Sequence, residues 1–126
     1  MTSRKHLTMA TLRQDGSPRI SGTEVQFSKK DMQIGSMPRS VKGMDLMRDG
    51  RVAIHGPTHD PAKDGKWRGE AKVSGRAIEV VPRKGDAHFF RINIEEVVIT
   101  QLNDTRDGLR IESWTPGRGY RVRERA

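Results

Sequence analysis

The chain has 126 residues, a formal net charge of +8, 33% hydrophobic residues and no cysteine. This length predicts a single domain over residues 1–126. The lack of cysteine excludes disulfides, thiolate metal sites and a cysteine nucleophile. The low hydrophobic content favours a homodimer, because part of the apolar surface would then be buried between subunits.

Neither a long apolar run nor a basic-then-apolar leader follows Met1. We therefore expect no membrane span and no secretory signal, and we expect the cytoplasm as the compartment. A basic surface attracts polyanions, which leaves nucleic acid, anionic lipid and phosphorylated small molecules as partner classes.

The first half of the chain predicts three short strands. Residues 7–13 and 19–27 flank an Asp15-Gly16 turn and predict a β-hairpin. Gly22 in the second strand indicates a bulge or a close approach by another group. Residues 31–35 predict a third strand.

A short helix is predicted next, within the stretch "GSMPRSVKGMDLMRDGR" at residues 35–51. Ser36 or Met37 is the expected N-cap, with Pro38 in the first turn, and the helix is expected to end at Asp49-Gly50. Its apolar positions recur at helical spacing and predict one apolar face: Met37, Val41, Met44 and Met47 or Arg48.

The second half predicts further strands at residues 51–55, 70–81 (with a bend at Gly75), 89–102 and 109–114. Residues 56–69 are expected to form a loop, and residues 115–126 a loose basic C-terminal tail. Six or seven strands with one short helix, all compatible with antiparallel pairing, predict an all-β, mainly antiparallel small barrel.

The sequence predicts no catalytic residue and no metal site. Gly56-Pro57 separates His55 from His59, so the two histidines cannot share a helix face at a standard metal-ligand spacing. The adjacent Glu95 and Glu96 would point to opposite faces of a strand, which argues against an acid–base pair. No serine has the setting of a nucleophile elbow.

The start of the predicted helix is the candidate binding site. Unpaired N–H groups and the positive end of the helix dipole attract an anion there. Ser36 and Ser40 add hydroxyl donors, and Arg39 and Lys42 add charged donors. The residues leave two interpretations open: a phosphate site, or an N-capped helix with a solvated basic face.

Three segments in order support a resemblance: "LTMATLRQDGSPRISGTEVQF", "DMQIGSMPRSVKGMDLMRDGRVAI" and "WRGEAKVSGRAIEV". This series resembles the pyridoxamine 5′-phosphate oxidase-like split-barrel flavoproteins, in particular their small bacterial flavin/deazaflavin oxidoreductase branch. The later stretches "FFRINIEEVVIT" and "IESWTPGRG" look like the closing strands of members of that branch.

The resemblance implies a split β-barrel that binds FMN or the deazaflavin coenzyme F-420 across a homodimer interface. It implies that a strand, turn and helix hold the phosphate, that the second strand lies along the ring, and that a tryptophan lies near the cofactor. The implied cofactor-binding residues are Arg19, Ile20, Ser21, Gly35, Ser36, Arg39, Ser40, Lys42 and Trp67.

The function expected from this resemblance is hydride transfer between the cofactor and a small organic substrate. Such a reaction needs no catalytic triad, because the cofactor carries the chemistry. A non-catalytic flavin-, haem- or tetrapyrrole-binding protein of the same fold is the alternative. A nucleic-acid-binding domain is a weaker expectation, because three Phe, one Tyr and two Trp provide no obvious stacking platform.

Overall fold

The computed structural model describes residues 3–28, 31–36, 40–80 and 88–126, and these residues form eight strands and one helix. In chain order the elements are β1 (Ser3–Leu12), β2 (Pro18–Phe27), β3 (Met32–Ser36), α1 (Val41–Arg48), β4 (Arg51–His55), β5 (Glu70–Val80), β6 (His88–Leu102), β7 (Leu109–Thr115) and β8 (Gly119–Arg125).

Six of the strands close into a barrel. The strand order is β3-β2-β1-β4-β5-β6-β7-β8, and β3 also pairs with β6, which closes the ring over β1 to β6. Every pairing is antiparallel. The expected mainly antiparallel split barrel with one short helix is therefore confirmed.

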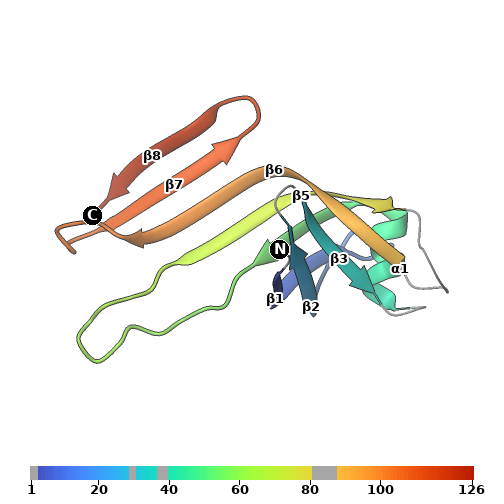
Figure 1. Ribbon diagram of the computed structural model, residues 1–126, viewed down its shortest axis with the longest axis horizontal. Coiled ribbons are helices and arrows are strands. Elements are labelled where there is room, and N and C mark those ends of the chain that lie inside the picture. The colour runs from blue at the N-terminus through green and yellow to red at the C-terminus, as the bar shows by residue number, and fades with distance from the viewer. Residues whose placement is uncertain (1–2, 29–30, 37–39, 81–87) are drawn as a thin grey trace.

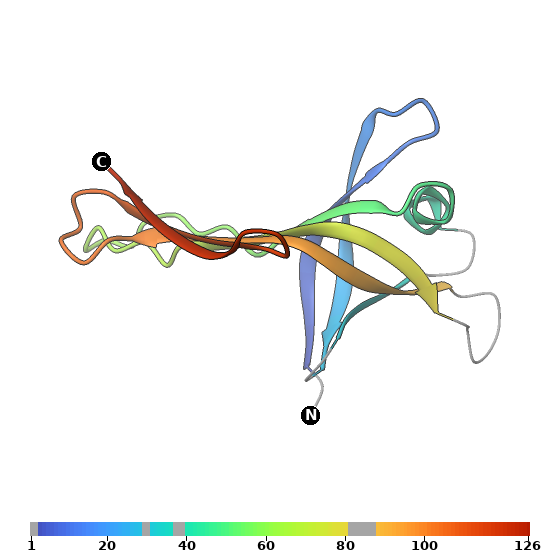
Figure 2. The same cartoon turned by 90° about the horizontal axis from the view of Figure 1, so that it is seen from above.

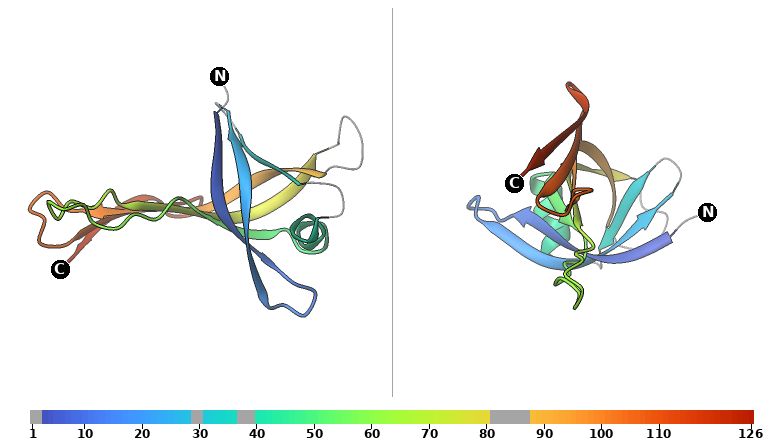
Figure 3. Two further views of the ribbon diagram at one scale, coloured as in Figure 1. Left: turned by 90° about the horizontal axis from the view of Figure 1, so that it is seen from below. Right: turned by 90° about the vertical axis from the view of Figure 1, so that its left-hand side faces the viewer.

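A flat arm projects from this barrel (Figure 1). It consists of β7 and β8, the parts of β5 and β6 that lie furthest from α1, and the 56–69 segment (Figure 2). The arm leaves the barrel on the side away from α1 (Figure 3). Residues 119–125 pair along β7 as a regular strand, so the expectation of a loose C-terminal tail is wrong.

Two glycines on strands behave differently. The register between β5 and β6 shifts between Ser74 and Gly75, which confirms the predicted bend. A Cβ at Gly75 would collide with the carbonyl group of Asn93, so the close strand approach requires glycine. No bulge occurs at Gly22, because the β1–β2 register runs unbroken past it.

The hydrophobic core lies inside the barrel and is built by strand alternation. On β2, for example, Thr23 and Val25 are buried while Gly22 and Glu24 are exposed. The main buried cluster consists of Met9, Val25, Met32, Ile34, Leu46, Val52, Ile54, Ala77, Phe90 and Ile92.

Helix α1 begins later than the sequence predicts. Ser40 is the N-cap, and its side chain accepts a hydrogen bond from the Gly43 N–H. Ser36 instead ends β3, so the expected cap at Ser36 is wrong, while Met37 and Pro38 lie outside the described residues. The helix ends at the C-cap Asp49, as predicted.

The face of α1 that packs on the barrel is also not the predicted one. Its buried residues are Gly43, Asp45 and Leu46, whereas Val41, Met44 and Met47 are exposed by 55%, 56% and 50%. Leu46 belongs to the hydrophobic core, and a carboxylate network centred on its neighbour also ties this helix to the barrel. The side of α1 that carries Val41, Met44 and Met47 is therefore exposed to solvent in the single chain.

That network centres on Asp45, whose side chain is only 2% exposed. Thr11 Oγ1 and Arg19 Nε each donate to Asp45 Oδ2 at 2.7 Å, and Arg48 donates to Oδ1 at 2.9 Å. Arg48 also donates to the Leu12 carbonyl oxygen at 2.9 Å. One carboxylate thus joins α1 to both strands of the β1–β2 hairpin.

Burial by itself would raise the pKa of the Asp45 carboxyl, but the hydrogen bonds from Arg19, Thr11 and Arg48 outweigh it, and the pKa is lowered. A lowered folded-state pKa means that ionised Asp45 stabilises the fold. This stabilisation is present above the unfolded-chain pKa of about 3.9. It is lost as the pH falls through the folded-state pKa.

We predict that Asp45→Asn lowers the free energy of unfolding by about 3 kcal/mol at neutral pH, because it leaves partly buried cations without their counter-charge. Urea unfolding followed by circular dichroism measures this value. The variant should also lose less stability than the wild type between neutral pH and about pH 3, since it lacks the titrating carboxyl.

Asp49→Asn is the matched control, because Asp49 follows α1 directly and pairs with Arg51 in solvent. Hydrogen bonds from Arg51 lower the pKa of Asp49 to about 2, but an exposed pair adds little stability. Equal destabilisation by the two substitutions would contradict the central place of Asp45.

Candidate functional site

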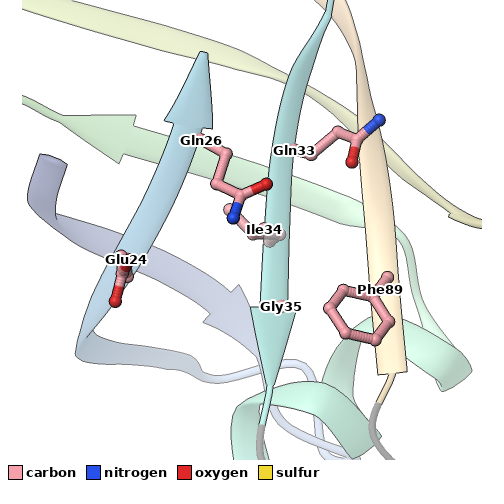
Figure 4. Close-up of a pocket in the computed structure, with 6 residues that line it drawn as sticks. All are labelled: Glu24, Gln26, Gln33, Ile34, Gly35 and Phe89. Carbon is pink, nitrogen blue, oxygen red and sulfur yellow. The ribbon is translucent and has the colours of Figure 1, made fainter. Parts of the chain in front are cut away.

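A groove crosses the outer wall of the barrel where β2, β3 and β6 lie side by side. It encloses about 260 Å³ and is lined by Glu24, Gln26, Gln33, Ile34, Gly35 and Phe89. In Figure 4, Gln26 on β2 and Phe89 on β6 lie on either side of β3. The β3–β6 pairing that closes the barrel therefore also forms this groove.

The floor of the groove is glycine for a steric reason. Gly35 lies opposite Phe89 in the β3–β6 register, and a Cβ at Gly35 would lie 3.1 Å from the Phe89 Cε1 atom. The aromatic ring thus rests against bare backbone. The result is a partly exposed apolar surface that a planar ligand ring can contact.

Polar side chains adjoin this apolar surface. Gln26 and Gln33 are cross-strand partners on the outer face of β2 and β3, and each carboxamide offers both donors and an acceptor. Glu24 lies two residues before Gln26 on the same face. An apolar wall bordered by amides suits a flat heterocycle with polar ring edges.

The start of α1 lies at the end of β3 in the same part of the molecule (Figure 4). Lys42 Nζ donates to the Gly22 carbonyl oxygen at 2.6 Å, which ties the first turn of the helix to β2. The ammonium has two further N–H groups for an anion. The Ser40 hydroxyl already accepts the Gly43 N–H but still has its own proton to donate.

The predicted β2 residues occupy two different faces. Ile20 is 74% exposed on the outer face. Arg19 and Ser21 point to the other face, where Arg19 is bonded to Asp45. The Ser21 hydroxyl and the Thr23 hydroxyl are buried without a hydrogen-bond partner among the described residues.

Trp67 lies apart from the other predicted residues. It belongs to the 56–69 segment of the arm, and its indole N–H donates to the His59 carbonyl oxygen at 2.9 Å. This segment lies at the opposite end of the molecule from α1 (Figure 1). A single chain does not bring Trp67 to the groove.

Two predicted phosphate-binding side chains lie outside the described part of the structure. Arg39 lies outside the described residues, and of Ser36 only the backbone, as the last residue of β3, is described. The structure therefore brings Gly35, Ser40 and Lys42 to one region with the exposed side of β2, and the ligand contacts of all nine residues stay predictions.

The described residues include no group of three or more histidine or acidic side chains that is placed to hold a metal ion. His55 Nε2 lies 3.1 Å from a Glu70 carboxylate oxygen, a contact between just two such groups. The eight residues of α1, the helix of the described ranges, are too few to cross a bilayer.

Sequence reasoning missed the groove residues Glu24, Gln26, Gln33 and Phe89. The outward positions on β2 and β3 follow from strand alternation once the hairpin register is known. The outward orientation of the two glutamines could therefore have been predicted from the sequence. Phe89 was not, because no local signal indicates that β6 pairs with β3 across more than fifty residues.

No protein-family model matches the sequence, and no curated protein matches it. Solved structures do match. The structure of PhzG from Burkholderia lata, in complex with tetrahydrophenazine-1-carboxylic acid, aligns with 96% of this chain and 81% of its own chain at a TM-score of 0.72 and 13% identity.

A pyridoxamine 5′-phosphate oxidase-related, FMN-binding protein from Nostoc punctiforme aligns with 96% of this chain and 86% of its own at a TM-score of 0.70 and 9% identity. An F-420 reductase aligns over 71% and 85% at a TM-score of 0.55 and 13% identity. Since these identities are low, the likeness concerns the fold. The chain thus has the split-barrel fold of the pyridoxamine 5′-phosphate oxidase-like proteins.

Proposed function

We propose that this protein is a homodimeric oxidoreductase that uses FMN or coenzyme F-420 to transfer a hydride to or from a small organic substrate. The observation that carries the proposal is the groove over Gly35, which has an apolar ring wall, an amide border and a cationic helix start beside it. The likeness in fold to an FMN-binding protein and to an F-420 reductase supports it.

The protein's own part in this reaction is to bind, orient and exclude water, while the bound flavin or deazaflavin ring supplies the hydride chemistry. Phe89 and the Gly35 backbone would hold the flat ring from one side. Gln26 and Gln33 would donate to and accept from its polar edge. Lys42 and Ser40, with the predicted Ser36 and Arg39, would hold the phosphate.

Three features of the single chain support the dimer: the small groove, the exposed apolar side of α1 and the position of Trp67. A groove of about 260 Å³ is smaller than the roughly 300–1,000 Å³ of typical ligand pockets, as expected of a half-site. Val41, Met44 and Met47 give α1 an uncovered apolar side. Trp67 could approach the groove of a chain only from a second copy.

We predict that Met44→Glu dissociates the dimer, because it places a charge in the centre of the apolar side of α1. Sedimentation velocity at about 10 μM protein should show a dimer for the wild type and a monomer for the variant. FMN affinity should fall in parallel, since the half-site loses its second wall.

Val122→Glu is the matched control, because Val122 is 45% exposed on the arm, far from α1. It should remain dimeric. A monomeric wild type would contradict the dimer, and dissociation by Val122→Glu but not by Met44→Glu would place the interface on the arm.

We further predict that Lys42→Ala weakens FMN binding about 10- to 150-fold, because a charge-assisted hydrogen bond to phosphate contributes roughly 1.5–3 kcal/mol. Riboflavin, which has the same ring without the phosphate, should bind wild type and variant within about threefold. Fluorescence titration measures both ligands, and F-420 is titrated in the same way.

The loss of the bond to the Gly22 carbonyl lowers stability by about 1 kcal/mol as well, so melting curves accompany each titration. Lys63→Ala removes an exposed lysine from the 56–69 segment and serves as the control for net charge. Equal weakening of FMN and riboflavin by Lys42→Ala would contradict the assignment of Lys42 to the phosphate.

Repeated turnover of the bound cofactor distinguishes an enzyme from a non-catalytic cofactor carrier. We expect the loaded protein to be reduced by NADH, NADPH or reduced F-420 and to be reoxidised repeatedly by an added quinone or nitroaromatic acceptor, followed by the visible spectrum. Tight cofactor binding without reduction by any of the three donors would favour the carrier.

A further inference from the structure

The last strand of the chain sorts its charges by face. In the β7–β8 register, Arg121, Arg123 and Arg125 lie opposite Ser113, Ile111 and Leu109, whereas Tyr120, Val122 and Glu124 lie opposite Trp114, Glu112 and Arg110. Because side chains alternate along a strand, the three arginines share one face of the arm.

Glu112 is bonded on the opposite face of this hairpin. Glu112 accepts the Tyr120 hydroxyl at 2.7 Å and pairs with Arg110 at 3.2 Å. Within the described ranges of the chain, Arg118, Arg121, Arg123 and Arg125 form no ion pair, and all four residues are exposed. We refer to these four residues as the arginine face.

The surface beside these arginines is hollowed. The hollow measures about 310 Å³, and its lining includes Arg118, Arg121, Arg123, Ser113, Ile111 and a single carboxylate, Glu96. It lies on the arm, which leaves the barrel on the side away from α1 (Figure 3). The arginine face is thus separate from the groove described above.

We propose that the arginine face binds the phosphodiester backbone of nucleic acid without reading its sequence. A strand rises about 3.3–3.4 Å per residue, so arginines at every second position repeat about every 6.8 Å along β8. Such a line of guanidinium groups matches a chain of phosphates, each of which arginine can bind in a bidentate manner.

The side chains of the arginine face also explain why binding would not depend on the base sequence of the nucleic acid. Trp114 and Tyr120, the aromatic residues of this hairpin, lie on the opposite face, so bases would find no stacking surface beside the arginines. Phosphate contacts alone give affinity and no sequence information. The scarcity of aromatic residues therefore does not count against binding of this kind.

The test is fluorescence anisotropy with a labelled duplex and a labelled single strand of about 20 nucleotides, between about 50 and 200 mM salt. We expect the wild type to bind with a slope of log K against log salt of about −0.9 per phosphate contacted for the duplex and about −0.7 for the single strand. Arg121→Gln/Arg123→Gln should make the duplex slope shallower by about 1.8 and reduce affinity at least about tenfold at low salt.

Arg13→Gln/Lys63→Gln is the matched control, because it removes the same charge from exposed positions in the β1–β2 turn and the 56–69 segment. It should bind the duplex within about twofold of the wild type. Circular dichroism checks the fold of both variants, whose substituted side chains are exposed.

Four results would overturn the proposal. The first is that the wild type does not bind at low salt, and the second is that the control variant loses as much duplex affinity as Arg121→Gln/Arg123→Gln. The third is that saturating FMN displaces the duplex, and the fourth is that poly-glutamate binds as well as the duplex at the same charge concentration and displaces it. The third result would place binding at the proposed cofactor site, and the fourth would show attraction to any polyanion.

Discussion

The placement of the only helix in the described ranges depends on one buried carboxylate. Asp45 accepts hydrogen bonds from Thr11 on β1, Arg19 on β2 and Arg48 on α1 itself. A buried charge is tolerated when it is paired and hydrogen-bonded, so the three donors must be present together. Because Asp45 and the core residue Leu46 face the barrel, the apolar side chains of Val41, Met44 and Met47 are left on the outer side of the helix. The start of α1, capped by Ser40 and tied to β2 by Lys42, lies at the end of β3 beside the groove over Gly35 (Figure 4).

Barrel closure and the groove share one cause. Pairing of β3 with β6 completes the ring and places Phe89 against Gly35. On the inside of the same strands, Ile34 and Phe90 belong to the core. Alternation thus gives each strand two sides, with apolar residues inward in the core and Gln26, Gln33 and Phe89 outward on the wall of the groove. A substitution that shifted the register of β3 by one residue would exchange the two sets.

The basic residues that give the chain its net charge of +8 fall into two groups with different surroundings. Arg19 and Arg48 neutralise Asp45, and Lys42 ties α1 to a backbone carbonyl. Arg19 and Arg48 thus act within the fold, while Lys42 lies in the region where the proposed phosphate would bind. The arginines of β8 have no such partners among the described residues and gather on one face of the arm. The first group supports the proposed cofactor site and the second supports the proposed nucleic-acid site, and each proposal has its own test.

The sequence by itself determined the segments that form β1 to β7, the end of α1 at Asp49, the bend at Gly75 and a small antiparallel barrel, because alternation, Asp-Gly turns and glycine are local signals. The split-barrel fold followed from the resemblance of the ordered segments. The sequence misjudged the start and the buried face of α1, since the helical spacing of Met37, Val41 and Met44 suggests an apolar contact on that side, whereas Asp45 and Leu46 face the barrel. It also missed β8, because "GYRVRER" is polar enough to read as a loose tail and gains its order by pairing with β7. Only the tertiary structure decided that Phe89 meets Gly35, that Arg19 faces Asp45 and that Trp67 lies far from α1. Each of these depends on long-range strand pairing, whose partners are selected by closure of the whole barrel and not by the residues next to them.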